Sequence, residues 1–366
     1  MTNASELFSK DGIVGYREFR ASTTWSPPFR MRAIVHCIGG GGSGGSNTVS
    51  GLCTAVSGGG AGEHSGSILI LDPAVTYTVT VGAGGAAAAN LTTANVGNAG
   101  NGGGTSSFSG TGITTITANG GSGGAQGSAS AGTGVSVSGG AGGTGGAGEL
   151  FTFDGGRGGD AEVTTSGLAN SGAISGGGAV GIEANGFRGG DAVYNAAVAS
   201  RRVATGGGGT GGRGGDNTVT GTGSTNPDTY GGSNTMNAGD VASGFADGDP
   251  PLGREFDSND QGSLEAIFSR GLFEALKVST FGYSTGGIWP PGFGGLGNTN
   301  GSGRSGGAFS GGGAAARSGS SITQSEGGYP GGGGGGVAII AFSSATLTCA
   351  PGGDGCVIIE ILEILA

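Results

Sequence analysis

Residues 31–42 have the sequence Met-Arg-Ala-Ile-Val-His-Cys-Ile-Gly-Gly-Gly-Gly. The first eight residues form a short apolar run of the kind found in β-strands, and four glycines end it. Glycine makes up 95 of the 366 residues, so this change from strand to glycine concerns the whole chain. The fold must therefore combine short strands with long glycine-rich segments.

Other strand patterns lie on both sides of a glycine-rich middle, at residues 67–81, 104–118, 337–342 and 356–365. The first of them turns at Asp72-Pro73 and then alternates Val or Tyr with Thr, which is the period of a strand with one buried face. We therefore expect a β-rich base over residues 31–118. We expect the C-terminal strands of residues 336–366 to pair back on this base.

The glycine-rich body is expected over residues 119–335. Pairs of glycines separated by single residues suit a polyglycine II or polyproline II-like helix with about three residues per turn. Such helices have no internal hydrogen bonds, so they must pack side by side, and only glycine lets their backbones approach closely. Flexible glycine loops on a β-core are the alternative. With either, the predicted fold class is mainly β.

Two further segments differ from the body in composition. Residues 1–30 contain five aromatic residues and few glycines, and Pro27-Pro28 ends them in an extended path. We predict a docking segment here, with an ordinary N-terminal strand and turn as the alternative. Residues 263–277 are mostly helix formers, so one short helix is expected in an inserted module over residues 245–295.

Composition excludes several classes of protein. Charged residues are 11% and hydrophobic residues 34% of the chain, so it lacks the high charge of disordered proteins. Collagen is excluded because glycine does not recur at every third position. The net charge is −10 and no cluster of basic residues exceeds Arg201-Arg202, so we expect no nucleic acid partner.

The sequence also predicts no membrane insertion and no secretory signal. It contains no apolar run of about 18 residues, the length that spans a membrane. Residues 1–10 lack a basic stretch followed by an apolar one. We therefore expect a protein that is assembled in a host cytoplasm and released by another route, such as lysis by a phage.

No pattern predicts an enzyme, a cofactor or a metal site. Ser43 lies in a Gly-x-Ser-x-Gly stretch, but more glycine follows it where a nucleophile elbow needs a helix. The two histidines are His36 and His64, and His36 is expected to be a satisfied strand residue rather than a general base. The four cysteines form no Cys-x-x-Cys pair, so we expect reduced, partly buried thiols. Pairing of the first and last strands could bring Cys37 near Cys356.

One motif, Arg-Gly-Gly-Asp, occurs three times, with its charged residues at Arg157 and Asp160, Arg188 and Asp191, and Arg213 and Asp216. In a helix with three residues per turn, the Arg and Asp of one motif lie on the same edge, about 9 Å apart. The structural hypothesis is that each side chain bonds to a neighbouring helix and sets its register. The alternative is calcium, because residues 155–163 resemble a calcium-binding β-helix repeat, although the motifs do not recur every nine residues.

Several separate stretches together resemble the glycine-rich domain at the tips of bacteriophage tail fibres. They are Trp25-Ser-Pro-Pro-Phe29 followed by a strand and the glycines of residues 39–42, then residues 72–85 with Tyr-Thr-Val-Thr-Val-Gly-Ala-Gly-Gly, residues 103–108, and residues 352–360 with the closing Gly-Cys-Val-Ile-Ile-Glu. The resemblance covers roughly residues 25–120 and 300–366, and residues 245–295 lie outside it.

The resemblance implies a virion protein at a tail or fibre tip that binds a protein or glycan receptor on the host cell. It further implies a homotrimer that joins other tail proteins through the N-terminal segment. The candidate receptor contacts are aromatic residues in turn-rich surroundings: Tyr230, Phe245, Phe256, Trp289, Phe293 and Tyr329. Alternatively, Trp289 and Phe293 pack on the predicted helix. A purely structural tail component and an ice-binding or surface-coating protein are the other functions considered.

Overall fold

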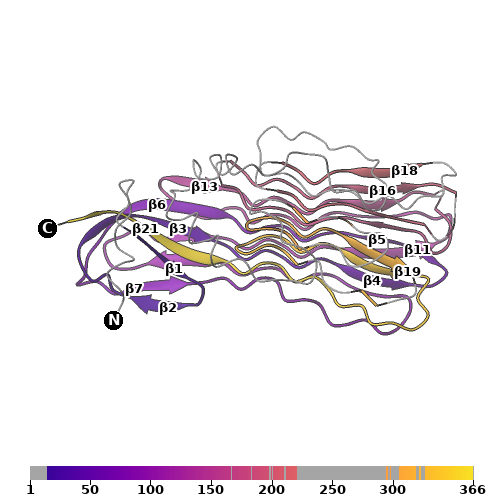
Figure 1. Cartoon of the computed structure of the whole chain (residues 1–366), viewed down its shortest axis with the longest axis horizontal. Coiled ribbons are helices and arrows are strands. Elements are labelled where there is room, and N and C mark those ends of the chain that lie inside the picture. Colours follow the sequence, from indigo (N-terminus) through magenta and orange to yellow (C-terminus); the bar gives the residue numbers. More distant parts are fainter. Residues whose placement is uncertain are drawn as a thin grey trace, which may run out of the picture.

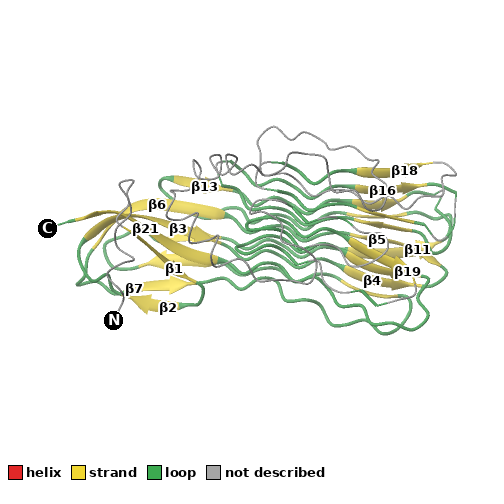
Figure 2. Ribbon diagram, viewed as in Figure 1, coloured by secondary structure: helices red, strands yellow, loops and turns green. Residues whose placement is uncertain are grey.

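The computed structural model describes residues 15–165, 167–182, 184–197, 199, 201–209, 212–220, 294–295, 297, 305–318, 321–322 and 326–365. Over these residues the protein is mainly β, with several sheets and no helix (Figure 2). The molecule is elongated, with sheets at both ends and long loops between them (Figure 1). The helix predicted within residues 263–277 lies outside the described part of the chain.

Two antiparallel sheets form one end, which we call the base. The first has the order β1(Gly15–Phe19), β21(Cys356–Ile364), β3(Met31–Ile38), β6(His64–Leu71) and β13(Phe151–Phe153). The second has the order β10(Ile116–Ala118), β9(Ser106–Ser109), β7(Tyr77–Thr80) and β2(Thr23–Trp25). Apolar residues of both sheets, among them Val35, Val357 and Phe108, are buried together in one core.

The register of β21 on β3 separates the two cysteines that the sequence places on these strands. Cys37 lies opposite Val357, and Cys356 lies opposite Ile38. Adjacent residues of a strand point to opposite faces, so the two thiols face away from each other. Cys37 packs in the core between the base sheets, whereas Cys356 packs on the other face. All four cysteines are free and buried.

Three four-stranded sheets form the other end, which we call the distal end. Their orders are β11(Gln126–Ser130), β5(Leu52–Val56), β15(Gly172–Ile174), β17(Arg202–Ala204); β12(Val135–Val137), β14(Ala161–Val163), β16(Ala192–Asn195), β18(Asn217–Thr220); and β19(Ala315–Ser318), β20(Val337–Ile340), β4(Ser46–Val49), β8(Val96–Asn98). The sheet of β5 is the middle layer. Ala173 and Tyr194 are buried between it and the β16 sheet, and Ile174 and Ile340 between it and the β20 sheet.

Glycine-rich stretches connect base strands with distal strands, and we call them crossing segments (Figure 1). Residues 39–45 link β3 to β4, residues 57–63 link β5 to β6, and residues 119–125 link β10 to β11. Crossing segments therefore come from the whole length of the described chain and not from residues 119–335 alone. The reason is that strands at either end of the molecule commonly continue directly into a crossing segment.

Consecutive N–H groups of a crossing segment bond to different neighbours, with a repeat of three residues. In the first segment, Gly39, Gly42 and Gly45 donate to residues 57–63, Gly40 and Ser43 to residues 101–104, and Gly41 and Gly44 to residues 350–353. Carbonyl groups of the same segment accept from three more stretches, through the N–H groups of Gly85, Gly121 and Gly334. This segment is thus bonded to six others, whereas a strand in a sheet bonds to two.

The close approach of these segments explains why they are glycine. A Cβ atom added to Gly41 would lie 2.1 Å from the carbonyl oxygen of Gly332, and one added to Gly44 would lie 1.9 Å from that of Gly335. Both contacts are far shorter than van der Waals distance, and the obstacle is backbone that cannot turn aside. Each such Cα carbon instead faces a neighbouring carbonyl oxygen, a geometry that allows weak Cα–H···O contacts.

We predict that Gly42→Ala destabilises the protein by about 3 kcal/mol, the upper range for overpacking a close-packed interior. The added Cβ would lie 2.1 Å from the carbonyl oxygen of Ser122. Gly102→Ala is the matched control, because its Cβ would meet nothing closer than 3.6 Å. Urea denaturation of both variants checks this prediction, and an equal loss of stability in the two would contradict it.

Candidate functional site

Five of the six aromatic receptor candidates, Tyr230, Phe245, Phe256, Trp289 and Phe293, lie outside the described residues. Tyr329 is described, and it is half-buried rather than exposed. Its hydroxyl donates to Glu18 Oε1 at 2.6 Å, and the guanidinium of Arg20 lies 4.5 Å from its ring centroid. Burial raises the pKa of Tyr329, so the hydroxyl keeps its proton. Tyr329 therefore contacts β1, and its role toward a receptor stays a prediction.

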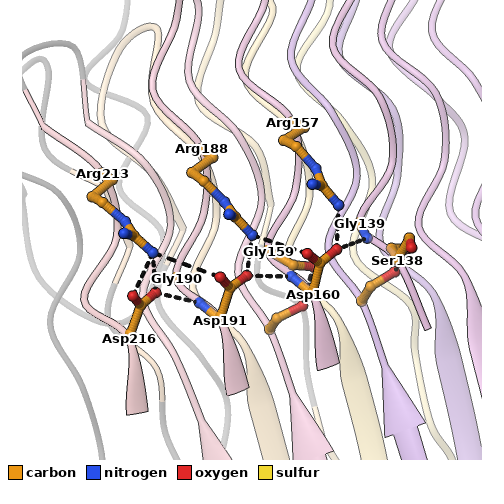
Figure 3. A network of polar contacts seen from close by, with 12 residues as sticks. Ser138, Gly139, Arg157, Gly159, Asp160, Arg188, Gly190, Asp191, Arg213 and Asp216 are labelled. Atoms are coloured by element: carbon orange, nitrogen blue, oxygen red, sulfur yellow. Dashed lines mark hydrogen bonds and ion pairs between the residues drawn. The ribbon is translucent and has the colours of Figure 1, made fainter. Parts of the chain in front are cut away.

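The three Arg-Gly-Gly-Asp motifs come together in one row at the distal end of the crossing segments (Figure 3). Asp160, Asp191 and Asp216 directly precede β14, β16 and β18. These strands pair in parallel and in register, with Ala192 beside both Ala161 and Asn217. The preceding aspartates are consequently neighbours as well.

Each aspartate binds the arginine of its own motif, and Asp160 and Asp191 also bind the arginine of the next motif. Arg157 pairs with Asp160, Arg188 with Asp191, and Arg213 with Asp216. Between motifs, Arg188 Nη2 lies 3.2 Å from Asp160 Oδ2, and Arg213 Nη2 lies 3.6 Å from Asp191 Oδ2. Arginines and aspartates thus alternate across three neighbouring segments.

The same carboxylates accept hydrogen bonds from the backbone. Gly139 N donates to Asp160 Oδ1 at 2.9 Å, Asp160 N to Asp191 Oδ1 at 2.6 Å, and Asp191 N to Asp216 Oδ1 at 2.8 Å. At the level of these aspartates, the strands of the sheet meet the crossing segments. A strand bonds to two neighbouring strands, whereas a crossing segment such as residues 39–45 bonds to six neighbouring segments. A buried N–H group needs an acceptor, and here the carboxylates supply it.

A second row of side chains lies at the same level, on the neighbouring sheet. Ser57, Ser175 and Thr205 directly follow β5, β15 and β17, which are also in register. Their hydroxyls donate to the carbonyl oxygens of Ser138 at 2.8 Å, Gly159 at 2.6 Å and Gly190 at 2.6 Å. We call these three residues and the three aspartates the distal collar. Within the collar, side chains of two sheets bind the backbone at the point where both sheets end.

The hydroxyl row was missed by sequence reasoning, although the sequence carries a signal for it. Ser57, Ser175 and Thr205 each stand between a short apolar run and three or more glycines. The repeat is short and lies in a chain with 95 glycines, so it is easily overlooked. Its regular position after a strand distinguishes it from the other Ser-Gly pairs.

The carboxylates of the collar are occupied by guanidinium groups, which take the place that a cation would have in a calcium site. Among the described residues, no three His, Cys, Asp or Glu side chains gather in a way that could hold a metal ion. Burial raises the pKa of Asp191, an effect that the hydrogen bond from Asp160 N and the charge of Arg188 oppose. Asp191 is the middle carboxylate of the row, and it pairs with Arg188 and with Arg213.

Glu63 has a comparable function nearer the base, where it is completely buried. Its carboxylate accepts hydrogen bonds from Asn119 N and Gly146 N, each at 2.9 Å. Ser43, considered above as part of a nucleophile-elbow pattern, is also buried among crossing segments. Its hydroxyl accepts from Asn101 N at 2.7 Å, so its contact is structural.

The two histidines form a buried chain of polar contacts in the base. His36 Nδ1 lies 3.1 Å from His64 Nε2, and His64 Nδ1 lies 3.1 Å from the carbonyl oxygen of Gly181. Glu360 Oε2 lies 3.5 Å from His36 Nε2. Burial lowers the pKa of His64 to about 3, and His36 adds to the shift. His64 Nδ1 therefore carries its proton toward Gly181, and the ring is neutral at ordinary pH.

One strip of the base sheet exposes large apolar side chains, which the sequence reasoning did not identify. Tyr16 is 38% exposed, Ile68 38% and Ile70 53%. The register Tyr16–Glu360–Ile34–Ile68 places Tyr16 and Ile68 on the same face, and Ile70 follows two residues later. This face is opposite to the one that packs on β7 and β9. We call Tyr16, Ile68 and Ile70 the base strip.

Asp191→Ala is expected to lower the free energy of unfolding by about 2 kcal/mol, because it leaves the Asp160 N–H without its acceptor and removes one of the two carboxylate partners of Arg188 and of Arg213. Glu162→Ala removes the same charge from an exposed strand position and should change stability by less than about 0.5 kcal/mol. Urea denaturation measures both. Equal losses of stability in the two variants would mean that Asp191 stabilises the protein only through its contribution to the net charge.

The histidine chain predicts a dependence of stability on pH. The pKa of His64 is lower in the folded protein than its ordinary value of 6.5, so below pH 6.5 the unfolded chain binds more protons. Stability should therefore fall as the pH drops from 6.5 toward 3, by at most about 1.4 kcal/mol per pH unit from this group. His64→Gln should make the fall less steep in urea titrations at several pH values. Parallel curves for the two proteins would contradict the prediction.

The search for relatives adds no further constraint on these sites. In the described residues no helix is long and apolar enough to cross a membrane. No protein-family model matches the chain, and no curated protein matches it in sequence.

Proposed function

We propose that the chain is a bacteriophage tail fibre or tail-tip protein that binds a receptor on the host cell surface. The observation that carries this proposal is the polarity of the elongated molecule. The described chain begins at Gly15 and ends at Leu365 at the base, while the distal end consists of turns between strands (Figure 1). A protein built in this way can attach by one end and present the other.

The glycine-rich region would then be a bundle of polyglycine II helices. Its support is the three-residue repeat of hydrogen bonds, the six bonded neighbours of residues 39–45 and the lack of space for a Cβ atom. Because every crossing segment is tied to several others, such a bundle holds the distal turns at a fixed distance from the base. This is what a receptor-binding tip needs and what flexible glycine loops would not supply.

Attachment to other tail proteins is assigned to the base. The base strip exposes three large apolar side chains on one face of the sheet, with Glu360 and Ile34 between Tyr16 and Ile68, and exposed apolar surface commonly marks an interaction site. Residues 15–30, part of the proposed docking segment, contribute β1 and β2 to the base sheets. Within this segment Phe19 is buried and Trp25 lies beside Tyr77. The docking contact would accordingly involve the outer face of the base, in a homotrimer located in the virion tail.

Receptor binding is assigned to the distal end and to the inserted module of residues 245–295. Strand β18 belongs to the distal end, and the sequence between β18 and β19 contains five of the six aromatic candidates. The receptor would be a protein or a glycan of the host surface.

An ice-binding or surface-coating function has less support. Such a protein would present regular faces of Thr or Ala, whereas the collar row presents ion pairs of Arg and Asp. A structural tail component without a receptor is the second candidate, since Tyr329 is engaged within the protein.

Adsorption experiments separate these functions. Fluorescently labelled protein should bind saturably to cells of a host strain and compete with the phage for adsorption. Deletion of residues 245–293 should abolish binding without loss of the folded base and distal sheets, because it keeps Gly295, whose backbone bonds to Gly207 and Gly311. Binding should persist in EDTA, because guanidinium groups rather than calcium balance the collar carboxylates.

A variant of the base strip separates attachment to the tail from binding to cells. Ile70→Asp should leave cell binding intact but reduce incorporation into tails, because it places a charge in the base strip. Absence of binding to every strain that the parent phage infects would refute the receptor-binding function and favour the structural tail component.

A further inference from the structure

Strand β1 is an edge strand of the base sheet and leads directly to the N-terminal segment. Among the described strands it pairs with β21 alone, from Gly15 opposite Ile361 to Phe19 opposite Val357. Strand β21 runs from the crossing segments toward the chain end at the base, and β1 runs in the opposite direction. The first residue of β1 therefore lies at the outer end of the molecule, and the strand points inward.

This orientation decides how β1 responds to tension. Inter-strand hydrogen bonds of an antiparallel pair are perpendicular to the strands. A pull on Gly15 along the long axis, away from the distal end, displaces β1 along β21 and loads these bonds together. A pull across the axis would instead open them one after another.

Side chains tie β1 to a second part of the protein. Glu18 accepts the hydroxyl of Tyr329 at 2.6 Å, and Arg20 Nε lies 3.1 Å from the same Glu18 oxygen. The guanidinium of Arg20 also lies over the Tyr329 ring. Glu18 is only 15% exposed, whereas Arg20 is 44% exposed, so the hydrogen bond from Tyr329 to Glu18 is the more shielded contact of the cluster and is strengthened by its low exposure to water.

Tyr329 is continuous with a crossing segment. Two residues after it, Gly331 N donates to the carbonyl of Asp354, and then Gly333 N and Gly334 N donate to Gly178 and Gly42. Force applied to β1 therefore reaches the crossing segments by two routes, through β21 and through Tyr329.

We propose that β1 is a mechanical clamp that transmits axial tension from the N-terminal side of the chain into the crossing segments, with the Glu18–Tyr329 hydrogen bond as its side-chain anchor. The biological purpose of this clamp rests on the proposed attachment of the protein through its base. The clamp itself is a property of the isolated full-length protein. It places the mechanical strength of the attachment in residues 15–20 and Tyr329.

Single-molecule force spectroscopy tests the clamp. One handle is fused before Met1 and the other is inserted in the exposed turn at Ser50–Gly51 of the distal end, so that tension acts along the axis. At constant force, Tyr329→Phe should shorten the lifetime of the first rupture about tenfold, as expected for loss of a hydrogen bond to a charged group. The first extension should correspond to release of the chain before β3.

Tyr77→Phe is the matched control. It also removes a tyrosine hydroxyl from the base, one that accepts from Asp72 N at 3.0 Å, but it does not touch β1. Its first-rupture lifetime should equal that of the unmodified protein. Arg20→Gln is a second variant that weakens the same cluster from an exposed position, for use if Tyr329→Phe does not fold.

An unchanged lifetime in Tyr329→Phe, or an equal change in Tyr77→Phe, would overturn the clamp. So would a first extension that starts at the distal sheets. Failure of the labelled protein to bind host cells would refute the proposed function and leave these force measurements unaffected, so the two results are distinguishable.

Discussion

The distance between neighbouring backbones, too short for a Cβ atom, is the constraint on which the structure depends. Wherever a carbonyl oxygen lies about 2 Å from the position of a Cβ, as at Gly41 and Gly42, only glycine can occupy the segment. Glycine loses more conformational freedom on folding than any other residue. This cost is offset by backbone hydrogen bonds, since each crossing segment bonds to many neighbours and contributes almost no apolar side chain to bury. The larger apolar cores therefore lie at the two ends, and one smaller cluster, with Ala61, Val180 and Phe309, lies where the crossing segments meet the base sheet.

Polar side chains are needed where crossing segments change into sheets. A strand bonds within one plane, and a crossing segment bonds in several directions. Backbone groups at the boundary would lack partners, and Asp191, Asp216, Ser175 and Thr205 provide them at the distal end. Glu63 provides the same at the other boundary. Charged and hydroxyl residues are consequently informative in this chain, because they mark the places where one kind of backbone packing replaces another.

Much of the base could be predicted from the sequence, because its strands follow ordinary apolar patterns. Residues 31–38 and 356–365 were expected as strands, and β3 spans Met31–Ile38 and β21 spans Cys356–Ile364. The strands of the distal sheets were largely missed. Many of them, such as Gly172–Ile174 and Arg202–Ala204, have three residues and include Ala or Gly, which pack closely but have weak strand propensity. Their existence depends on neighbours far away in the sequence.

Only part of the candidate site could be predicted, because the rest also depends on neighbours far away in the sequence. A spacing of three residues was enough to expect the Arg and Asp of one motif on a common edge. It could not show that motifs 25 and 31 residues apart would lie side by side, as Asp191 does with Asp216 and Asp160. Tyr329 was expected to be exposed because glycines surround it. In the folded protein the glycines instead bring other backbones close, and Glu18, which lies 311 residues away, contacts the ring hydroxyl.

The contacts of residues 39–45 also dictate an order of folding. Gly41 and Gly44 donate to Gly353 and Ala350, so one of the first crossing segments to be synthesised bonds to one of the last. Loop closure over such a distance is slow, and contacts between distant residues generally delay folding. A growing chain on the ribosome cannot complete the environment of its first glycine run until its C-terminal strand has emerged. Completion of the glycine-rich region therefore waits for residues 350–353, and loss of β21 would leave β1 without the strand on which it pairs.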